Sequence, residues 1–228
     1  FLIFRTAQIA TLPQISTSYP TFPAFAYLCF TMKIICIGRN YAAHIKELNN
    51  DTPAEPVVFL KPDTALLKNN EPFYYPSHSS DVHHEVEVVV RIHKNGKFIA
   101  PEFAHKYYDE IGLGVDFTAR DVQQRLKEKG LPWEIAKGFN GSAPVSEMVP
   151  KSHFTNLQDL HFSLAVNGEV KQKGHTALML TTIDQMIAYV SQFFQLKTGD
   201  LIFTGTPEGV GPVKIGDTLT GYLDCLLY

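Results

Sequence analysis

The feature that most constrains the fold is a β-branched run at residues 86–92, VEVVVRI, preceded directly by Glu85. β-Branched side chains favour extended backbone, so the run predicts a strand. Because side chains alternate faces along a strand, the valines at even positions should enter a core, while Glu85 and Glu87 point together to the other face. Two adjacent carboxylates repel each other unless a cation neutralises them. Hard divalent ions such as Mg²⁺, Mn²⁺ or Ca²⁺ suit this pair, although a solvated strand face would also accommodate it.

A third carboxylate follows a second predicted strand. The segment GLGV at residues 112–115 has strand character and delivers Asp116 to its end. Asp116 could complete a three-carboxylate metal site with Glu85 and Glu87, which is the donor chemistry that Mg²⁺ and Mn²⁺ prefer. The alternative is that Asp116 only caps a helix or lies in a loop.

A histidine and a glutamate share one face of a predicted helix. Residues 41–48 have helical character, and His44 and Glu47 are three positions apart. A carboxylate beside an imidazole orients the ring and raises its basicity, which is the arrangement of a general base acting on water. An exposed ion pair on a surface helix would leave the same pattern.

Two further segments could contribute to a site. Lys137 lies in WEIAKGF at residues 133–139, where it is either a surface charge or a cation placed near developing negative charge. The loop TGTPEGVGP at residues 204–212 follows a short apolar strand and lacks the Gly-Lys-Ser/Thr ending of a nucleotide P-loop. Its hydroxyl and N–H groups could hold a small carboxylate, or it could be a plain tight turn.

The composition excludes several classes of protein. Of 228 residues, 45% are hydrophobic, as in folded soluble proteins, and the net charge of −3 comes without clustered Lys or Arg, so we expect no nucleic-acid partner. No run approaches the roughly 20 apolar residues that a membrane helix needs. Three widely spaced cysteines predict neither a disulfide framework nor a thiolate zinc site, so we expect reduced thiols in a cytoplasmic protein.

The chain divides at Met32. Residues 1–31 contain no Asp, Glu or Lys and only one Arg, which predicts an N-terminal extension. If that leader is a transit peptide, the compartment would be the mitochondrial matrix, but transit peptides are rich in Arg. Residues 32–228 predict an α+β domain in which strands predominate, with hairpins at residues 95–96 and 167–168. Helices are predicted over residues 119–129 and 183–194, the latter with a capping box formed by Thr182 and Gln185.

Taken together and in this order, the segments resemble the fumarylacetoacetate hydrolase family from about Met32 onward. The matching segments are IGRNY at 37–41 with His44 and Glu47, FLKP at 59–62, HEVE at 84–87, DFTARD at 116–121, KGF at 137–139 and TGTP at 204–207. The likeness is greatest to small single-domain members of the acylpyruvate hydrolase and oxaloacetate decarboxylase type, because of KGLPW at 129–133. Gly138 and Asn140 depart from the usual pattern, and we assign no role to either.

The resemblance implies a mixed β-sheet roll with few short helices, a bound Mg²⁺ or Mn²⁺ and a homodimer. We expect Glu85, Glu87 and Asp116 to hold the metal, and the substrate to be a small 2-oxo acid cleaved at a C–C bond through an enolate. His44, oriented by Glu47, would activate water, and Lys137 would stabilise the oxyanion. Arg39, Gln123 and Thr206 would bind the substrate. The alternatives are a 2-hydroxyhepta-2,4-diene-1,7-dioate isomerase and a non-catalytic, metal-dependent oxo-acid binding protein.

Overall fold

A computed structural model describes residues 2–5, 7–10 and 32–224. The α+β prediction is confirmed, because mixed sheets predominate and the helices are few and short. The strands are β1 (Leu2–Arg5), β2 (Ala7–Ala10), β3 (Ile34–Gly38), β4 (Val57–Lys61), β5 (Leu66–Leu67), β6 (Pro72–Tyr74), β7 (Val82–His84), β8 (Val86–Ile92), β9 (Tyr108–Val115), β10 (Thr118–Ala119), β11 (Ala143–Pro144), β12 (Val149–Pro150), β13 (His161–Val166), β14 (Glu169–His175), β15 (Leu201–Phe203), β16 (Gly211–Pro212) and β17 (Leu219–Leu223).

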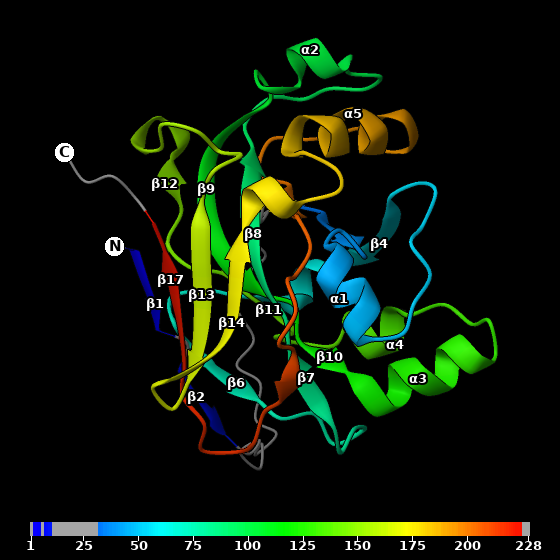
Figure 1. Cartoon of the computed structure of the whole chain (residues 1–228), viewed down its shortest axis with the longest axis vertical. Coiled ribbons are helices and arrows are strands. Elements are labelled where there is room, and N and C mark those ends of the chain that lie inside the picture. The colour runs from blue at the N-terminus through cyan, green and yellow to red at the C-terminus, as the bar shows by residue number, and fades with distance from the viewer. Residues whose placement is uncertain (1, 6, 11–31, 225–228) are drawn as a thin grey trace, which may run out of the picture.

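The helices are short and lie around the sheets. They are α1 (Ala42–Glu47), α2 (Pro101–Ala104), α3 (Arg120–Glu128), α4 (Glu134–Lys137) and α5 (Ile183–Phe193), with 3₁₀ turns at Asp63–Ala65, Lys151–His153 and Thr176–Leu178. Figure 1 shows α2 and α5 across one end of the sheets and α3 with α4 at the opposite end.

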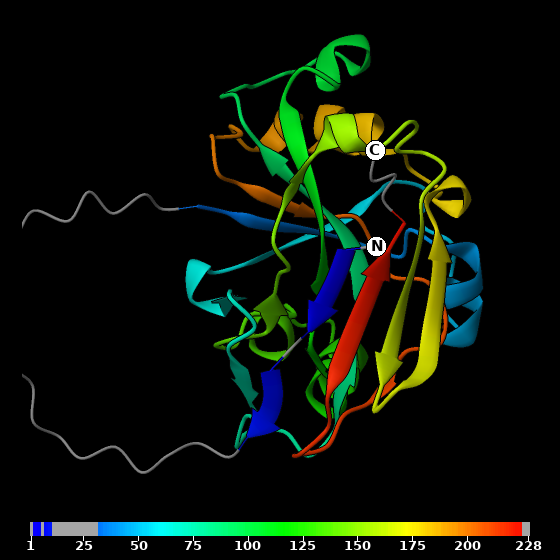
Figure 2. The same cartoon turned by 90° about the vertical axis from the view of Figure 1, so that its left-hand side faces the viewer.

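Two sheets form the roll. The larger has six strands in the order β12-β9-β8-β15-β3-β4, and the smaller has four in the order β1-β17-β13-β14. Within the larger sheet β15 runs parallel to β3, whereas β8 pairs antiparallel with both β9 and β15. Figures 1 and 2 show the smaller sheet lying across β8 and β9, so that β8, which carries Glu87 and follows Glu85 directly, runs through the middle of the fold.

The alternation predicted for residues 86–92 is confirmed by the packing. Val86, Val88 and Val90 are fully buried in the main core, together with side chains from β13 and α5. On the opposite face Val89 packs against Cys36 and Phe203 in a second apolar cluster. Burying one such side chain contributes about 1.5–3 kcal/mol, and a β8 shifted by one residue would place the Glu87 carboxylate in this apolar core.

Most local predictions are confirmed. Helix α3 lies within the predicted range 119–129, and α5 begins with the predicted reciprocal capping box of Thr182 and Gln185. The hairpin at residues 167–168 joins β13 to β14, and both Asn167 and Gly168 adopt positive φ, as a tight hairpin turn requires.

The hairpin predicted at residues 95–96 is wrong. Neither Asn95 nor Gly96 adopts positive φ. The Asn95 side chain instead accepts a hydrogen bond from the backbone N–H of Thr198, and Gly96 pairs with Leu196. Tertiary contacts with the segment after α5 therefore hold this turn, and β8 pairs with β9 only after the chain has passed through α2.

The N-terminal extension contributes two strands to the fold. β1 pairs antiparallel with β17, and β2 pairs parallel with β6. Cys29 and Cys225 lie outside the described residues, whereas Cys36 is a buried free thiol. In the described part of the chain, no helix is both long and apolar enough to cross a membrane.

Candidate active site

The three predicted carboxylates converge. Glu85 lies between β7 and β8, Glu87 in β8, and Asp116 directly after β9, where its N–H donates to the Glu85 carbonyl over 2.8 Å. Each offers an oxygen within 4.8 Å of those of the other two. All three residues are at most 5% exposed. Pairing of β8 with β9 thus brings together acids that are about thirty positions apart in the sequence.

Lys137, at the end of α4, lies directly on this carboxylate cluster. Its Nζ donates to Glu85 Oε2 at 2.8 Å, to Asp116 Oδ2 at 2.7 Å and to the Thr118 hydroxyl at 2.6 Å. Burial opposes a charged lysine, but Asp116 and Glu85 outweigh it and raise the pKa of Lys137. Since a lysine has three N–H donors, all three are used within the protein in this arrangement.

Two more cations contact the cluster, and sequence reasoning gave them no role. Lys61 Nζ lies 2.7 Å from Asp116 Oδ1 and also hydrogen-bonds the Ser142 carbonyl and hydroxyl. Arg120 binds Glu85 Oε1 at 2.5 Å and the Gln123 side chain at 2.7 Å. The available signal was a lysine at the end of the apolar strand segment VVFL, because a buried lysine needs a carboxylate partner.

Glu87 is left without such a cation. Its carboxylate accepts the Gly205 N–H at 2.6 Å, and no described lysine or arginine forms an ion pair with it. Burial, together with repulsion from Asp116 and Glu85, raises the pKa of Glu87 well above its ordinary value. For Glu85 burial acts in the same direction, but Lys137 and Arg120 outweigh it and hold the pKa well below the ordinary range.

These residues fit a hard divalent cation. Asp116 Oδ1 is buried and lacks a hydrogen-bond donor of good geometry, although Lys61 Nζ is near. Glu87 carries a buried carboxylate that accepts one backbone N–H and forms no ion pair with a described lysine or arginine. Three carboxylate oxygens within reach of one point are the donor set of Mg²⁺ and Mn²⁺ sites.

The predicted His44–Glu47 pair is present on α1. His44 Nδ1 lies 3.1 Å from Glu47 Oε2, and the other carboxylate oxygen of Glu47 accepts the Gly209 N–H at 2.9 Å. A glutamate held at both oxygens fixes the imidazole, and a proton on Nδ1 leaves Nε2 free to act as a base.

The loop at residues 204–212 holds carboxylates, as its composition allowed, but those carboxylates belong to the protein. Gly205 N–H binds Glu87 and Gly209 N–H binds Glu47, so one loop ties the carboxylate cluster to α1. Gly205 has φ of +100°, and a Cβ there would lie 2.7 Å from Asn40 Cβ. Only glycine fits this position without displacing the start of α1.

The predicted site residues line one narrow cleft. Apart from Glu47, which supports His44 from outside it, the lining contains every one of them: Arg39, His44, Glu85, Glu87, Asp116, Gln123, Lys137 and Thr206. Arg39 and Lys127 both donate to Asn50 Oδ1, at 3.3 and 2.8 Å. Burial, then Arg39 and Arg120, lower the pKa of Lys127, so this part of the cleft carries excess positive charge suited to an anion.

The family model described as fumarylacetoacetate hydrolase C-terminal matches residues 33–224. The chain belongs to the fumarylacetoacetate hydrolase family. An oxaloacetate tautomerase of Escherichia coli (strain K12) is 47% identical over 193 residues, which cover 84% of this chain and 88% of that protein. The mitochondrial oxaloacetate tautomerase of Mus musculus is 46% identical, with 84% and 86% covered.

Solved structures of the family agree with the fold. A fumarylpyruvate hydrolase from Pseudomonas aeruginosa, in complex with Mn²⁺ and pyruvate, superimposes with a TM-score of 0.80 at 36% identity, covering 96% of this chain and 91% of that one. A 2-hydroxyhepta-2,4-diene-1,7-dioate isomerase from Mycobacterium marinum gives 0.74 at 35% identity, covering 84% and 70%. The relatives named here are thus tautomerases, a hydrolase and an isomerase.

Proposed function

We propose that this chain is a divalent-metal-dependent enzyme that forms the enol or enolate of small 2-oxo acids, with oxaloacetate as its foremost substrate. The observation that carries the proposal is one cleft holding three buried carboxylates, of which Glu87 lacks a cation, opposite a histidine oriented by a glutamate. The names of the relatives at 46–47% identity support oxaloacetate as the substrate.

Glu85, Glu87 and Asp116 would hold Mg²⁺ or Mn²⁺. When bound, the cation supplies Lewis-acid stabilisation of negative charge on the 2-oxo oxygen. Lys61, Lys137 and Arg120 balance the carboxylates, so that the cation adds net positive charge to the cleft. A dianionic 2-oxo acid would offset that charge, and Arg39 and Lys127 would attract its far carboxylate.

His44 would move the proton. In keto–enol interconversion, Nε2 accepts the proton that leaves the carbon beside the 2-oxo group and the C–H electron pair becomes the enol double bond. The C=O π pair moves to the oxygen, which takes the proton back from the imidazolium, so that the neutral imidazole is restored. Glu47 stabilises the imidazolium formed in between. Gln123 and Thr206 would orient the substrate, because both line the cleft beside the carboxylates.

Cleavage reactions are the second candidate. The same enolate forms when oxaloacetate loses CO₂ or when water attacks the acyl carbon of an acylpyruvate, and the likeness to a fumarylpyruvate hydrolase bound to Mn²⁺ and pyruvate favours including them. The homodimer and the cytoplasmic location stay predictions from the sequence. The mitochondrial names of several relatives support the alternative compartment.

One substrate panel tests these activities. With Mg²⁺ present, we would follow loss of the enol absorbance of oxaloacetate, pyruvate formation from oxaloacetate, and loss of absorbance of acetylpyruvate and fumarylpyruvate. We expect tautomerisation to be the fastest, and addition of a chelator to stop it. Activity on none of these substrates, with Mg²⁺ still raising the melting temperature, would favour the binding-protein alternative.

A further inference from the structure

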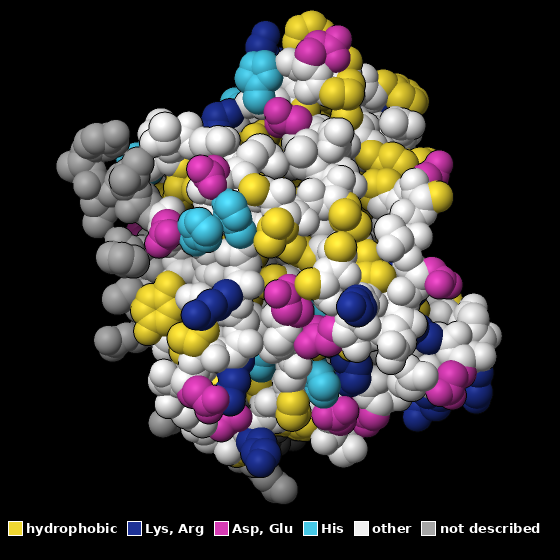
Figure 3. All heavy atoms as spheres, viewed as in Figure 1, with side chains coloured by type: hydrophobic (Ala, Val, Ile, Leu, Met, Phe, Trp, Pro, Cys, Tyr) yellow, Lys and Arg dark blue, Asp and Glu magenta, His cyan; other side chains and the backbone are white. Residues whose placement is uncertain are grey.

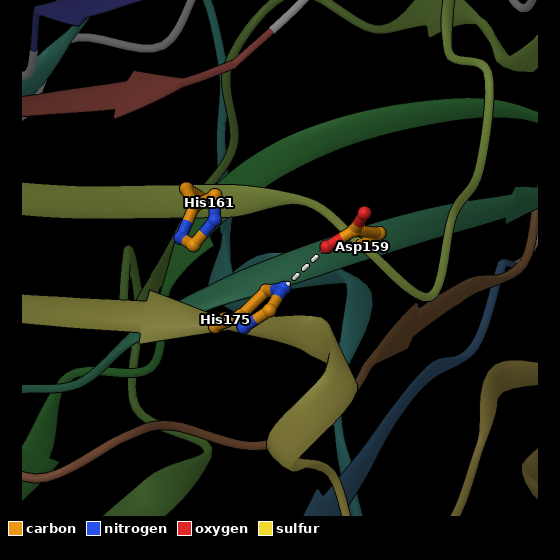
Figure 4. Close-up of side chains that lie close together, drawn as sticks. All are labelled: Asp159, His161 and His175. Atoms are coloured by element: carbon orange, nitrogen blue, oxygen red, sulfur yellow. Dashed lines mark hydrogen bonds and ion pairs between the residues drawn. The ribbon is translucent and has the colours of Figure 1, made fainter.

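A second group of side chains that could ligate a metal lies outside the active-site cleft, at the open end of the β13–β14 hairpin, away from its turn. It comprises Asp159, His161 and His175, each of which offers a ligand atom within 4.8 Å of the others. Figure 4 shows the three side chains gathered on one side of the two strands, and in Figure 3 histidine and acidic side chains adjoin at the surface there. None of the three lines the active-site cleft.

The pairing of β13 with β14 holds the two histidines side by side. His161 and His175 are direct partners in the antiparallel pairing of β13 with β14, so their side chains leave the sheet on the same face. Their rings lie stacked, with centroids 4.1 Å apart and planes inclined by 17°. Asp159 lies in a bend two residues before β13, and its side chain reaches the same side of the two strands (Figure 4).

The third ligand is already directed at the pair. The ring nitrogen Nε2 of His175 donates to Asp159 Oδ1 over 2.7 Å, and the backbone N–H of Asp159 bonds the Asn156 carbonyl over 3.1 Å. The short turn before β13 thus holds the carboxylate at the imidazoles. In this respect the group is organised before any ion binds, which lowers the ordering cost of binding.

We propose that Asp159, His161 and His175 form a second metal site, selective for Zn²⁺ and related borderline ions such as Ni²⁺ and Co²⁺. Two imidazoles and one carboxylate are a three-ligand set that zinc accepts in proteins, with further positions left to water. The active-site cluster offers oxygen donors only and suits Mg²⁺ or Mn²⁺. The chain therefore separates the two classes of ion by ligand chemistry.

Binding would link the end of β14 to the turn before β13. Ligation at Nε2 moves the ring proton of a neutral His175 to Nδ1, whereas a protonated histidine must first lose a proton. Binding therefore weakens as the pH falls through the range in which histidines protonate. Because the site lies on the smaller sheet, we expect Zn²⁺ binding there to raise the melting temperature without being needed for turnover.

The test is calorimetric titration of the full chain with Zn²⁺ under saturating Mg²⁺, so that the carboxylate cluster is already filled. We expect a binding event that His161→Ala and His175→Asn each remove, while His105→Ala, at an exposed histidine outside the group, leaves it intact. The same event should persist in Glu87→Gln, which separates it from zinc entering the active site. Co²⁺ should broaden the ring proton resonances of His161 and His175 only.

Melting curves recorded without added metal establish that each variant is folded. The proposal is overturned if the two histidine variants bind Zn²⁺ as the parent does, if His105→Ala loses binding equally, or if Glu87→Gln alone abolishes the event.

Discussion

At the scale of single residues, the decisive feature is that three neighbouring carboxylates differ in the number of cations that they contact. Glu85 contacts Arg120 and Lys137, whereas Glu87 accepts only one backbone N–H. In a low-dielectric interior, such a difference in partners shifts the pKa values of two chemically identical side chains in opposite directions. We therefore expect Glu87 to couple metal binding and protonation to the stability of the protein.

Glu87→Gln should stabilise the metal-free protein and remove its response to Mg²⁺. The folded-state pKa of Glu87 lies above the ordinary value of 4.5, so between the two values the folded state holds a proton that the unfolded state has lost. Stability therefore falls as the pH rises through this window. The amide keeps an acceptor for Gly205 N–H and removes the charge, which should add about 1–3 kcal/mol above the window.

Melting temperatures measured from about pH 5 to pH 8, with and without Mg²⁺, check this linkage. Parent protein should lose stability toward high pH and regain it with Mg²⁺, whereas the variant should show neither effect. Equal Mg²⁺-induced stabilisation in both proteins would exclude Glu87 as a ligand.

His44→Ala should slow steps that move a proton or activate water more than it slows decarboxylation. Loss of a general base costs about 10²–10⁴-fold in the step that uses it. We expect that loss for oxaloacetate tautomerisation and acylpyruvate cleavage, and a smaller one for CO₂ release, which needs only a stabilised enolate. Glu47→Gln should show the same pattern more weakly, because the imidazole remains.

Rates at saturating substrate with the same metal are required, so that weaker binding is not mistaken for slower chemistry. Equal losses on all substrates would show that His44 closes the cleft or positions the substrate, and the assignment as a base would be abandoned.

At the scale of elements, the short helix α1 depends on one asparagine. Asn40 is 3% exposed, and its side-chain amide donates to the carbonyls of Thr204 at 2.8 Å and Thr181 at 3.1 Å. Its side-chain oxygen accepts the N–H of Thr181 at 2.8 Å. A helix of six residues has little stability of its own, so these contacts set where His44 lies.

Asn40→Asp should displace α1 without touching the carboxylate cluster. The new oxygen would face two carbonyls that have lost their donor, at a cost of about 1–3 kcal/mol or more. We expect a lower melting temperature and slower tautomerisation, while Mg²⁺ still stabilises the protein. Asn69→Asp, at an exposed left-handed position, is the matched control. Identical behaviour of the two variants would show that Asn40 does not place His44.

At the scale of the whole molecule, the active-site cleft and the described strands of the N-terminal extension lie on different parts of the roll. Among the described residues, those that line the cleft lie between positions 37 and 206. β1 lies at the edge of the smaller sheet against β17, and contributes backbone pairing rather than a group in the cleft.

A chain starting at Met32 should therefore keep its turnover per folded molecule. Removing β1 exposes the edge of β17, and unpaired sheet edges promote self-association. We expect the same kcat with more aggregation, measured by active-site titration with kinetics and by analytical ultracentrifugation. A lower kcat in the monodisperse fraction would show that the extension supports the site from a distance.

The sequence by itself determined the strand carrying Glu85 and Glu87, the helices α3 and α5, the His44–Glu47 pair and the hairpin at residues 167–168. Each depends on side-chain alternation, helical spacing or turn chemistry, which act over a few residues.

Only the tertiary structure decided which cations pair with which carboxylates. Lys61 and Arg120 reach the carboxylates because β4 and α3 pack beside them, and no local pattern marks either residue as a partner of Asp116 or Glu85. The turn at residues 95–96 formed no hairpin, because contacts with Leu196 and Thr198 outweighed its local preference. Long-range contacts of this kind depend on the packing of whole elements, which sequence spacing does not encode.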